Sequence, residues 1–448
     1  MSTDGDDRRP RRHGLRTHLQ HLTIDLTPLR VSRDYRRIWA GLLVSESGYH
    51  FTVVATFIQV TELTGSAAAV GLTGLFGLIG LVIGSLVGAA FLDAFDRRRL
   101  LIWAQVGFIA VAGVLLAGAI TGDPPVILIY VAVALIGVFS TIDGPVRSAM
   151  TPRLVGQELL PSALALQQIV WNMTALAGPA VAGIVIARFG LEWAYAVDLV
   201  TYGAMLVAAI SISPMAPNHE EGERPLGWAA VREGVGFVRR SRLLQSTFVV
   251  DIVAMVFGLP RALFVFLAIS QFGRGEEIVG LLFAAPAVGA LLGAASSGWT
   301  RRVRRQGMAV IWAVVAWGAA IAAFGAVEHL GFALALLAVA GWADVVSAIF
   351  RTTILQVSVP DRLRGRLSGI HILVVTGGPR LGDLEAGLVA AAFSPTVSVI
   401  SGGLACIVGA GIVALGYPEL RAYRAGETVD DASGAMTGET IGAGDPAD

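Results

Sequence analysis

Residues 67–99 read AAAVGLTGLFGLIGLVIGSLVGAAFLDAFDRRR, an uninterrupted apolar run followed by a charged loop. The first 26 of these residues carry no charge. An α-helix rises about 1.5 Å per residue, so such a run is longer than the roughly 30 Å thickness of the hydrocarbon core of a bilayer. The segment therefore predicts a membrane-spanning helix that ends in a basic loop.

The same pattern recurs along the chain. Of its 448 residues, 55% are hydrophobic and 15% are charged, and the mean hydropathy is +0.70. A soluble protein carries about 25% charged residues. The runs are continuous rather than alternating, which excludes a transmembrane β-barrel. We therefore predict an all-α polytopic membrane protein with twelve spans, at residues 38–61, 67–92, 100–121, 125–143, 163–187, 192–213, 244–271, 278–299, 308–327, 330–350, 368–393 and 396–416.

The positive charges are distributed asymmetrically between the predicted loops. All 33 cationic residues are Arg, and they balance the 33 acidic residues. Twenty-nine of them lie before the first span, after the last span or in the loops on that same side. Because Lys and Arg accumulate on the cytoplasmic side of membrane proteins, we expect a multi-pass protein of the cytoplasmic membrane with both termini in the cytoplasm.

The composition also excludes several kinds of chemistry. Without Lys the chain has neither a phosphate-loop lysine nor a Schiff-base lysine. The single Cys406 excludes an internal disulfide, a multi-cysteine zinc site and a cysteine-bound iron–sulfur cluster. Neither a His-Glu-x-x-His motif nor a Gly-x-Ser-x-Gly turn is present. We expect no enzymatic activity, no cofactor, no metal and no nucleic-acid partner.

The loop at 214–243 divides the spans into two sets of six. Over 227–240, apolar residues recur at helical spacing and basic residues stand beside them, which predicts an interfacial helix. A Gly-Pro pair occurs in the fifth span of each half, at Gly178-Pro179 and Gly378-Pro379, 200 positions apart. Two pseudo-symmetric six-helix bundles with a site between them are typical of secondary transporters. The predicted parts are a cytoplasmic tail at 1–37, bundles at 38–213 and 244–416 flanking the 214–243 loop, and a disordered acidic tail at 417–448.

Several motifs resemble those of the major facilitator superfamily. Residues 89–98, AAFLDAFDRR, resemble its Gly-x-x-x-Asp-x-x-Gly-Arg-Arg signature, with Ala89 and Asp96 in place of the glycines. Further details are similar to the branch that includes the enterobactin exporter and actinobacterial multidrug exporters. They are Leu63-Thr-Gly-Ser66, Asp93-Ala-Phe-Asp96-Arg-Arg, Gly144-Pro-x-Arg147 and Phe257-Gly-x-Pro-Arg-Ala-Leu-Phe264.

The resemblance implies the major facilitator fold and alternating-access transport, usually export driven by proton antiport. Residues 174–183 are similar to the antiporter motif of the fifth span and retain Gly178, Pro179 and Gly183, whereas Thr174 and Ala182 replace two glycines. The resemblance also implies a loop that latches the two bundles together on the cytoplasmic side. The candidates for this gating loop are Asp93, Asp96, Arg97, Arg98 and Arg147.

Charged residues within the spans are the candidates for proton coupling, because each one costs roughly 2.5–3.5 kcal/mol at the bilayer centre. Glu46 and His50 lie four residues apart, hence on one helical face. Arg261 and Arg380 form a candidate charge network with nearby carboxyls, in which Arg380 could pair with Asp383. A purely structural ion-pair cluster remains an alternative. The coupling candidates are Glu46, His50, Asp251, Asp344, Asp383 and Glu385.

We therefore expect a monomeric secondary exporter of a small amphipathic molecule, such as a drug or a siderophore, exchanged for protons. The alternatives are an importer of a small nutrient, proton-coupled or facilitative, and a receptor or scaffold that transports nothing. Pro260 should kink the seventh span, since it cannot donate to the helix ladder. The candidates for lining an amphipathic cavity are Tyr49, Phe51, Trp171, Asn172, Phe257 and Trp342.

Overall fold

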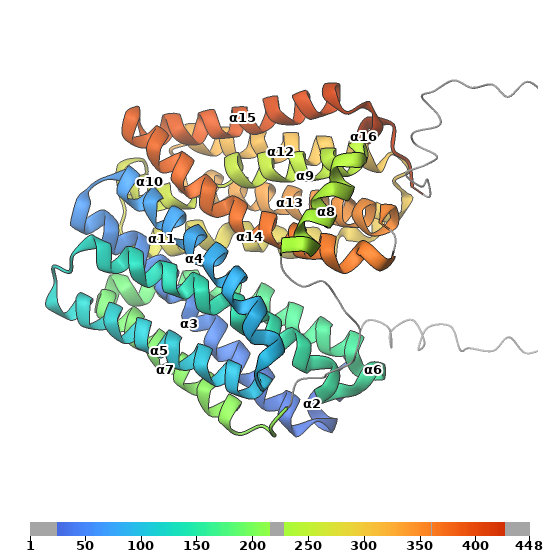
Figure 1. The fold of residues 1–448 in the computed structure, drawn as a ribbon. Coiled ribbons are helices and arrows are strands. Elements are labelled where there is room, and N and C mark those ends of the chain that lie inside the picture. Colours follow the sequence, from blue (N-terminus) through green and yellow to red (C-terminus); the bar gives the residue numbers. More distant parts are fainter. Residues whose placement is uncertain (1–24, 216–227, 360, 426–448) are drawn as a thin grey trace, which may run out of the picture.

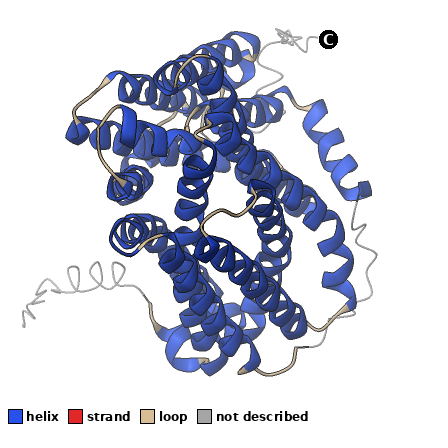
Figure 2. Ribbon diagram, turned by 90° about the vertical axis from the view of Figure 1, so that its left-hand side faces the viewer, coloured by secondary structure: helices blue, strands red, loops and turns tan. Residues whose placement is uncertain are grey.

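The computed structural model describes residues 25–215, 228–359 and 361–425, and the described residues are helical with no strand. Figure 1 shows the helices lying side by side in two groups, with the loops gathered at the two ends. Figure 2, turned by 90°, shows helices and loops and no strand in the described part of the chain. The first group contains α2 (Thr27–Val31), α3 (Arg33–Thr64), α4 (Ala67–Ala94), α5 (Arg97–Thr121), α6 (Val126–Phe189) and α7 (Leu191–Ile210).

The second group begins beyond the central loop. Its elements are α8 (Trp228–Arg240), α9 (Arg242–Phe257), η1 (Arg261–Leu263), α10 (Phe264–Ser270), α11 (Glu276–Ala295), η2 (Ser297–Arg302), α12 (Gln306–Ala326), α13 (Leu330–Ser358), α14 (Asp361–Ala392), α15 (Pro395–Gly416) and α16 (Pro418–Ala422).

In the part of the chain that the structure describes, nine helices are long and apolar enough to cross a membrane. One of them, α6, covers both the fourth and the fifth predicted span. The first and eleventh predicted spans lie on α3 and α14, which are not among the nine because these long helices carry charged side chains near their centres. The helices are consistent with the twelve predicted spans. Large apolar side chains are exposed around the outside of the bundle, including Ile120, Val200, Trp312 and Leu415. Such a surface suits contact with lipid chains.

The boundary between the fourth and fifth predicted spans differs from the sequence-based expectation, whereas the break in the seventh span agrees with it. The loop expected between the fourth and fifth spans is helical, and α6 runs over 64 residues with one kink, at Gly156, whose φ is 76°. Only glycine adopts such a φ readily. Apolarity marks the part of a helix inside the bilayer, whereas this helix continues beyond it. The seventh span breaks before Pro260 into α9, η1 and α10, as the proline predicts.

The two groups pack together at one end of the molecule. Gly71 of α4 and Gly387 of α14 approach so closely that a Cβ added at Gly387 would lie 2.8 Å from the Gly71 Cα. Gly183 of α6 and Gly280 of α11 make a second such contact. Both contacts lie away from the Arg-rich loops, at what we call the far end, and we call the opposite end the basic end.

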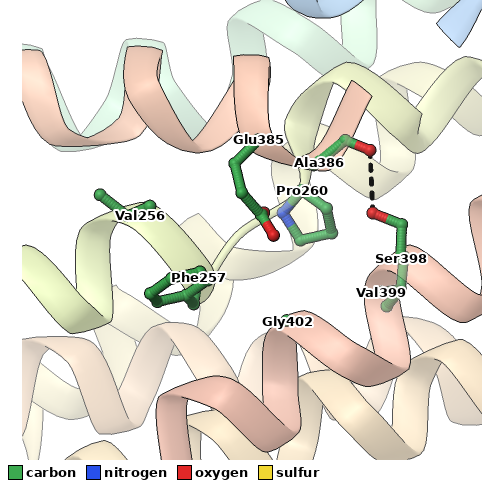
Figure 3. Close-up of a pocket in the computed structure, with 8 residues that line it drawn as sticks. All are labelled: Val256, Phe257, Pro260, Glu385, Ala386, Ser398, Val399 and Gly402. Carbon is green, nitrogen blue, oxygen red and sulfur yellow. Dashed lines mark hydrogen bonds between the residues drawn. The ribbon is translucent and has the colours of Figure 1, made fainter. Parts of the chain in front are cut away.

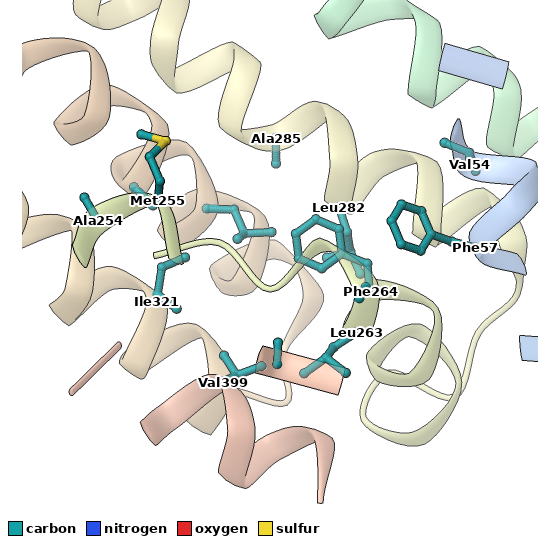
Figure 4. Close-up of a cluster of buried hydrophobic side chains, with 14 of the residues drawn as sticks. Val54, Phe57, Ala254, Met255, Leu263, Phe264, Leu282, Ala285, Ile321 and Val399 are labelled. Carbon is teal, nitrogen blue, oxygen red and sulfur yellow. The ribbon is translucent and has the colours of Figure 1, made fainter. Parts of the chain in front are cut away.

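Aromatic packing reinforces the far-end contact. The ring of Phe57, from α3, lies 5.7 Å from that of Phe283, from α11, and Phe283 lies 5.0 Å from the ring of Phe264, from α10. Figure 4 shows Phe57 beside Phe264 and Leu282, so that one buried core runs across both groups.

At the basic end, two short helices close the second group. The segment predicted to form an interfacial helix is helical as α8, and its Phe237 and Val238 pack against buried residues of α9, α13 and α14. The tail expected to be disordered from 417 instead begins with α16, because Leu420 and Tyr423 are both buried. Residues 1–24, 216–227 and 426–448 lie outside the described residues.

Candidate functional site

Three charged side chains form a buried group in the first half, which we call the N-terminal triad: Glu46, Asp143 and Arg147. The Arg147 Nη2 lies 2.6 Å from Asp143 Oδ2 and 3.4 Å from Glu46 Oε1. Glu46 comes from α3, whereas Asp143 and Arg147 lie one turn apart on α6. All three side chains are less than 20% exposed. One guanidinium thus faces two carboxylates.

A second group, the C-terminal triad of Asp251, Asp344 and Arg351, has the same composition. The Arg351 Nη1 lies 2.8 Å from Asp251 Oδ1, and its Nη2 lies 3.5 Å from Asp344 Oδ1. Asp251 comes from α9, whereas Asp344 and Arg351 lie on one face of α13. Asp251 and Arg351 are 2% and 4% exposed, and Asp344 is 36% exposed.

The two triads are related by the internal repeat of the chain. Asp251 follows Glu46 by 205 positions, and Arg351 follows Arg147 by 204. In each half, the helix of the first span supplies a carboxylate, and the helix that contains the fourth span, α6 or α13, supplies the arginine and a second carboxylate. The glycine contacts follow the same relation, since Gly387 follows Gly183 by 204 positions.

Each triad has further polar neighbours. The Gln105 Nε2 donates a 2.8 Å hydrogen bond to Asp143 Oδ1. Near Glu46, the buried carboxylate of Asp198 accepts hydrogen bonds from the hydroxyls of Thr52 and Thr201. The His371 Nδ1 lies 3.3 Å from Asp251 Oδ2.

Beside the C-terminal triad lies a small pocket with room for about one water molecule, lined by Thr247, Phe248, Asp251, Arg351, Leu355 and His371.

The other charged candidates lie nearer the far end. Asp383 pairs with Arg261, with 2.7 Å between Asp383 Oδ2 and Arg261 Nη2, and its Oδ1 accepts a 3.2 Å hydrogen bond from the backbone N–H of Ala262. Asp383 therefore pairs with Arg261, at the break in the seventh span, rather than with Arg380 as predicted. Arg380 instead packs against Gly77 of α4.

Glu385 lines a second, narrow pocket beside Pro260 and Phe257 (Figure 3). This pocket lies between the break in the seventh span and helices α14 and α15, where Ser398 bonds the Ala386 carbonyl. The structure thus separates Asp383 and Glu385, which point to different partners.

The residues of the predicted gating loop bond within the first group of helices. Asp96 caps α5 by accepting a hydrogen bond from the N–H of Arg99, and Arg97 donates to the Ala149 carbonyl. Arg98 donates to the carbonyls of Ala209 and Ile210. Arg147 lies in the buried triad. The side chain of Asp93 lies outside the described residues.

The antiporter-like motif of α6 lies where the halves meet. Gly178 packs against His50, since a Cβ there would lie 2.8 Å from the His50 Cβ. Pro179 and Gly183 contact Gly280 of the other half. His50 contacts this motif and the ring of Tyr49, and among the described residues no hydrogen bond joins it to Glu46.

The six cavity candidates are not brought together. Phe257 lines the pocket of Glu385, and Phe51 is 7% exposed within the core. Trp342 stacks on Trp299 and donates to Ser296, and Trp171 is 59% exposed. Asn172 accepts a hydrogen bond from Gln168, and Tyr49 packs against the core.

Two residues of the triads, Asp143 and Arg351, were not among the sequence-based candidates, and neither was His371 beside Asp251. Asp143 and Arg351 stand at predicted span ends, where charges are ordinary. Two features of the sequence could have pointed to these residues. Asp143 lies four residues before Arg147, on the same helical face, and Arg351 repeats Arg147 after 204 positions.

Comparison with known proteins decides the family. The model of the transmembrane secretion effector family, within the major facilitator superfamily, matches residues 23–433. The chain belongs to this family. It is therefore a multi-pass membrane transporter and not an enzyme.

Two relatives are similar over almost their whole length. The enterobactin exporter EntS of Citrobacter koseri (strain ATCC BAA-895) is 25% identical over 422 residues, which cover 92% of this chain and 98% of the relative. EntS of Shigella boydii serotype 18 is 25% identical over 409 residues, which cover 90% of this chain and 97% of the relative.

Solved structures share the fold of this transporter. A POT family transporter in complex with a thioalcohol-conjugated peptide has a TM-score of 0.69 at 12% identity, covering 87% of this chain and 96% of that one. A bacterial homologue of the iron transporter ferroportin, in an inward-facing state, has a TM-score of 0.64 at 15% identity, covering 87% and 99%. At these identities the likeness shows the fold alone.

Proposed function

We propose that this transporter exports a small amphipathic molecule in exchange for protons. The observation that carries the proposal is the pair of buried triads, one in each half. Buried ionisable groups at membrane depth are costly and are typical of ion and proton pathways. The direction and the substrate class are supported by the likeness to relatives named as enterobactin exporters.

Protons would act by changing the charge that each triad places in the protein interior. One arginine against two carboxylates carries a net negative charge, which is unfavourable in a region of low dielectric. Binding one proton restores neutrality and lets the triad be enclosed. Since a ligand shifts a conformational equilibrium only by binding one state better, this difference would couple protons to alternating access. Among the coupling candidates we place Glu46, Asp251 and Asp344 first.

Asp383 and Glu385 would have other roles. Asp383 forms a one-to-one pair with Arg261 and also bonds the backbone at the start of η1, so it would hold the helix break in place. Glu385 and its pocket lie between helices of one half. The gating role of Asp93, Arg97 and Arg98 stays a prediction drawn from the family resemblance.

The distribution of arginines supports an orientation with the basic end and both termini in the cytoplasm. With that orientation, the far-end packing closes the protein toward the outside, which is the state that would take up cargo from the cell.

Labelling tests this orientation. In a Cys406→Ala background, single cysteines at Gly122 and Ser394, in far-end loops, should react with an impermeant maleimide in intact cells. Cysteines at Arg240 and Arg304 should react only after permeabilisation. Labelling of the cysteine at position 240 in intact cells would contradict the orientation.

Export is tested in everted vesicles, whose interior is acidified by respiration. Proton-coupled exporters should accumulate cargo in such vesicles, and enterobactin is the first probe because of the named relatives. Accumulation should stop when the proton gradient is collapsed by an uncoupler. Uptake only into right-side-out vesicles would instead indicate an importer.

The substrate is sought by comparing the small molecules released by cells with and without the gene, at low and high iron. A siderophore exporter should change the released catecholates chiefly at low iron. A protein that moves no molecule in either vesicle orientation, and changes no released molecule, would be a receptor or scaffold.

A further inference from the structure

The two triads share a charge imbalance that bears on how many protons the transporter binds. Each contains one arginine and two carboxylates within 3.5 Å of its guanidinium nitrogens. The Arg261–Asp383 pair, by contrast, is one-to-one. With every carboxyl ionised, each triad carries one uncompensated negative charge and the Arg261–Asp383 pair carries none.

The neighbours of the N-terminal triad do not remove this imbalance. Gln105 of α5 is neutral, and Asp198 of α7 adds a further carboxylate that bonds two hydroxyls and no arginine. His50 of α3 packs against Gly178 one turn from Glu46, and Tyr202 of α7 is buried nearby.

In the C-terminal triad, His371 of α14 contacts Asp251 and offers a second position for a proton. Cys406 of α15 is buried, and its thiol donates to the Val314 carbonyl. Neutrality of either triad therefore requires one added proton, whichever atom holds it.

Both triads are partly exposed in this conformation. Glu46 is 18% exposed and Asp344 is 36% exposed. The small pocket beside Asp251 and Arg351 is also lined by His371, which is 23% exposed.

We propose that the transporter has two equivalent proton sites, one at each triad, and exchanges two protons in each transport cycle. The inference rests on the proposed proton antiport. It follows from the repeat, because Glu46, Arg147, Asp251 and Arg351 occupy matched positions in the two halves. The second carboxylates differ in position, four residues before the arginine in one half and seven in the other.

Removing one carboxylate from a triad leaves a neutral pair and isolates each site without stranding a charge. Asp143→Asn keeps an acceptor for Gln105 and leaves Glu46 paired with Arg147. Asp344→Asn leaves Asp251 paired with Arg351. Where either variant folds poorly, Glu46→Gln or Asp251→Asn makes the same change in charge from the other carboxylate.

The measurement is the number of protons that purified protein takes up when the pH is stepped from alkaline to mildly acidic, with the carboxyl C=O stretch followed by infrared spectroscopy. Each single variant should take up one proton fewer than the wild type, and Asp143→Asn with Asp344→Asn two fewer. Asp383→Asn and Asp198→Asn, which alter carboxyls outside the triads, should leave the triad signals unchanged.

A double variant that loses one proton or none would overturn the proposal. So would loss of a triad signal in Asp383→Asn or Asp198→Asn. The titration needs no substrate, so its outcome is separate from that of the vesicle assay. Full proton uptake without gradient-driven transport would refute the antiport and leave the two proton sites intact.

Discussion

Replacing Arg351 with Gln is expected to destabilise the protein by about 3–5 kcal/mol, the usual cost of leaving buried charges unpaired. Asp251 and Asp344 would lose their shared guanidinium in a site where Arg351 is 4% exposed. The repeat predicts a similar loss for Arg147→Gln, which would strand Glu46 and Asp143. The measurement is the yield of solubilised protein and its thermal unfolding in detergent.

Two further variants separate this electrostatic effect from a loss of packing. Adding Asp251→Asn and Asp344→Asn to Arg351→Gln removes the stranded charges, and it should restore most of the stability while removing the proton that this triad takes up. The matched control is Arg242→Gln, because Arg242 pairs with Glu419 at the surface and is 61% exposed. An exposed pair is worth about 0–1 kcal/mol. If Arg351→Gln were as stable as Arg242→Gln, the triad would contribute nothing to folding.

Replacing Gly183 or Gly387 with Leu is expected to prevent closure of the far end and to lower transport at least about 10-fold, equivalent to roughly 1.4 kcal/mol. A Cβ at Gly183 would lie 2.7 Å from the Glu276 carbonyl oxygen, and one at Gly387 would lie 2.8 Å from the Gly71 Cα. Both obstacles are backbone atoms of the opposite half, so the halves must move apart.

The separation of the halves is measured between spin labels at Asp123 and Ser394, in far-end loops of the two groups, in a Cys406→Ala background. The label distance should increase in both glycine variants. Gly411→Leu is the control, because a Cβ there meets nothing within 4 Å. An unchanged distance in Gly183→Leu and Gly387→Leu, with normal transport, would show that these contacts do not close the far end.

Much of the fold followed from simple physical properties of the chain. Apolar runs longer than the bilayer is thick can only be helices there, because the backbone has no water to bond. Pro260 also predicted the break in the seventh span, because proline has no backbone N–H to donate to the helix. The predicted ends of the helices were less accurate, and the loop predicted before residue 163 is part of α6. A helix needs apolar side chains only within the bilayer and can continue into water without them.

The site was predictable only in part. Glu46, Asp251 and Asp344 stood out because charges inside apolar runs are costly. Arg351 and Asp143 lie at the edges of such runs, where a charge costs little and carries no signal. Counting Arg351 among the loop arginines was reasonable by composition, but the structure places it in the interior against Asp251 and Asp344.

The sequence by itself determined the helical class, the two repeated halves and the identity of most buried charges, because these depend on composition and on spacing along one helix. Only the tertiary structure decided which charges meet. Glu46 and Arg147 are 101 positions apart, and Asp251 and Arg351 are 100 apart. Their contact depends on the depth and rotation of separate helices, which the packing of the whole bundle sets. For the same reason Asp383 bonds Arg261 across the helix break rather than Arg380 on its own helix.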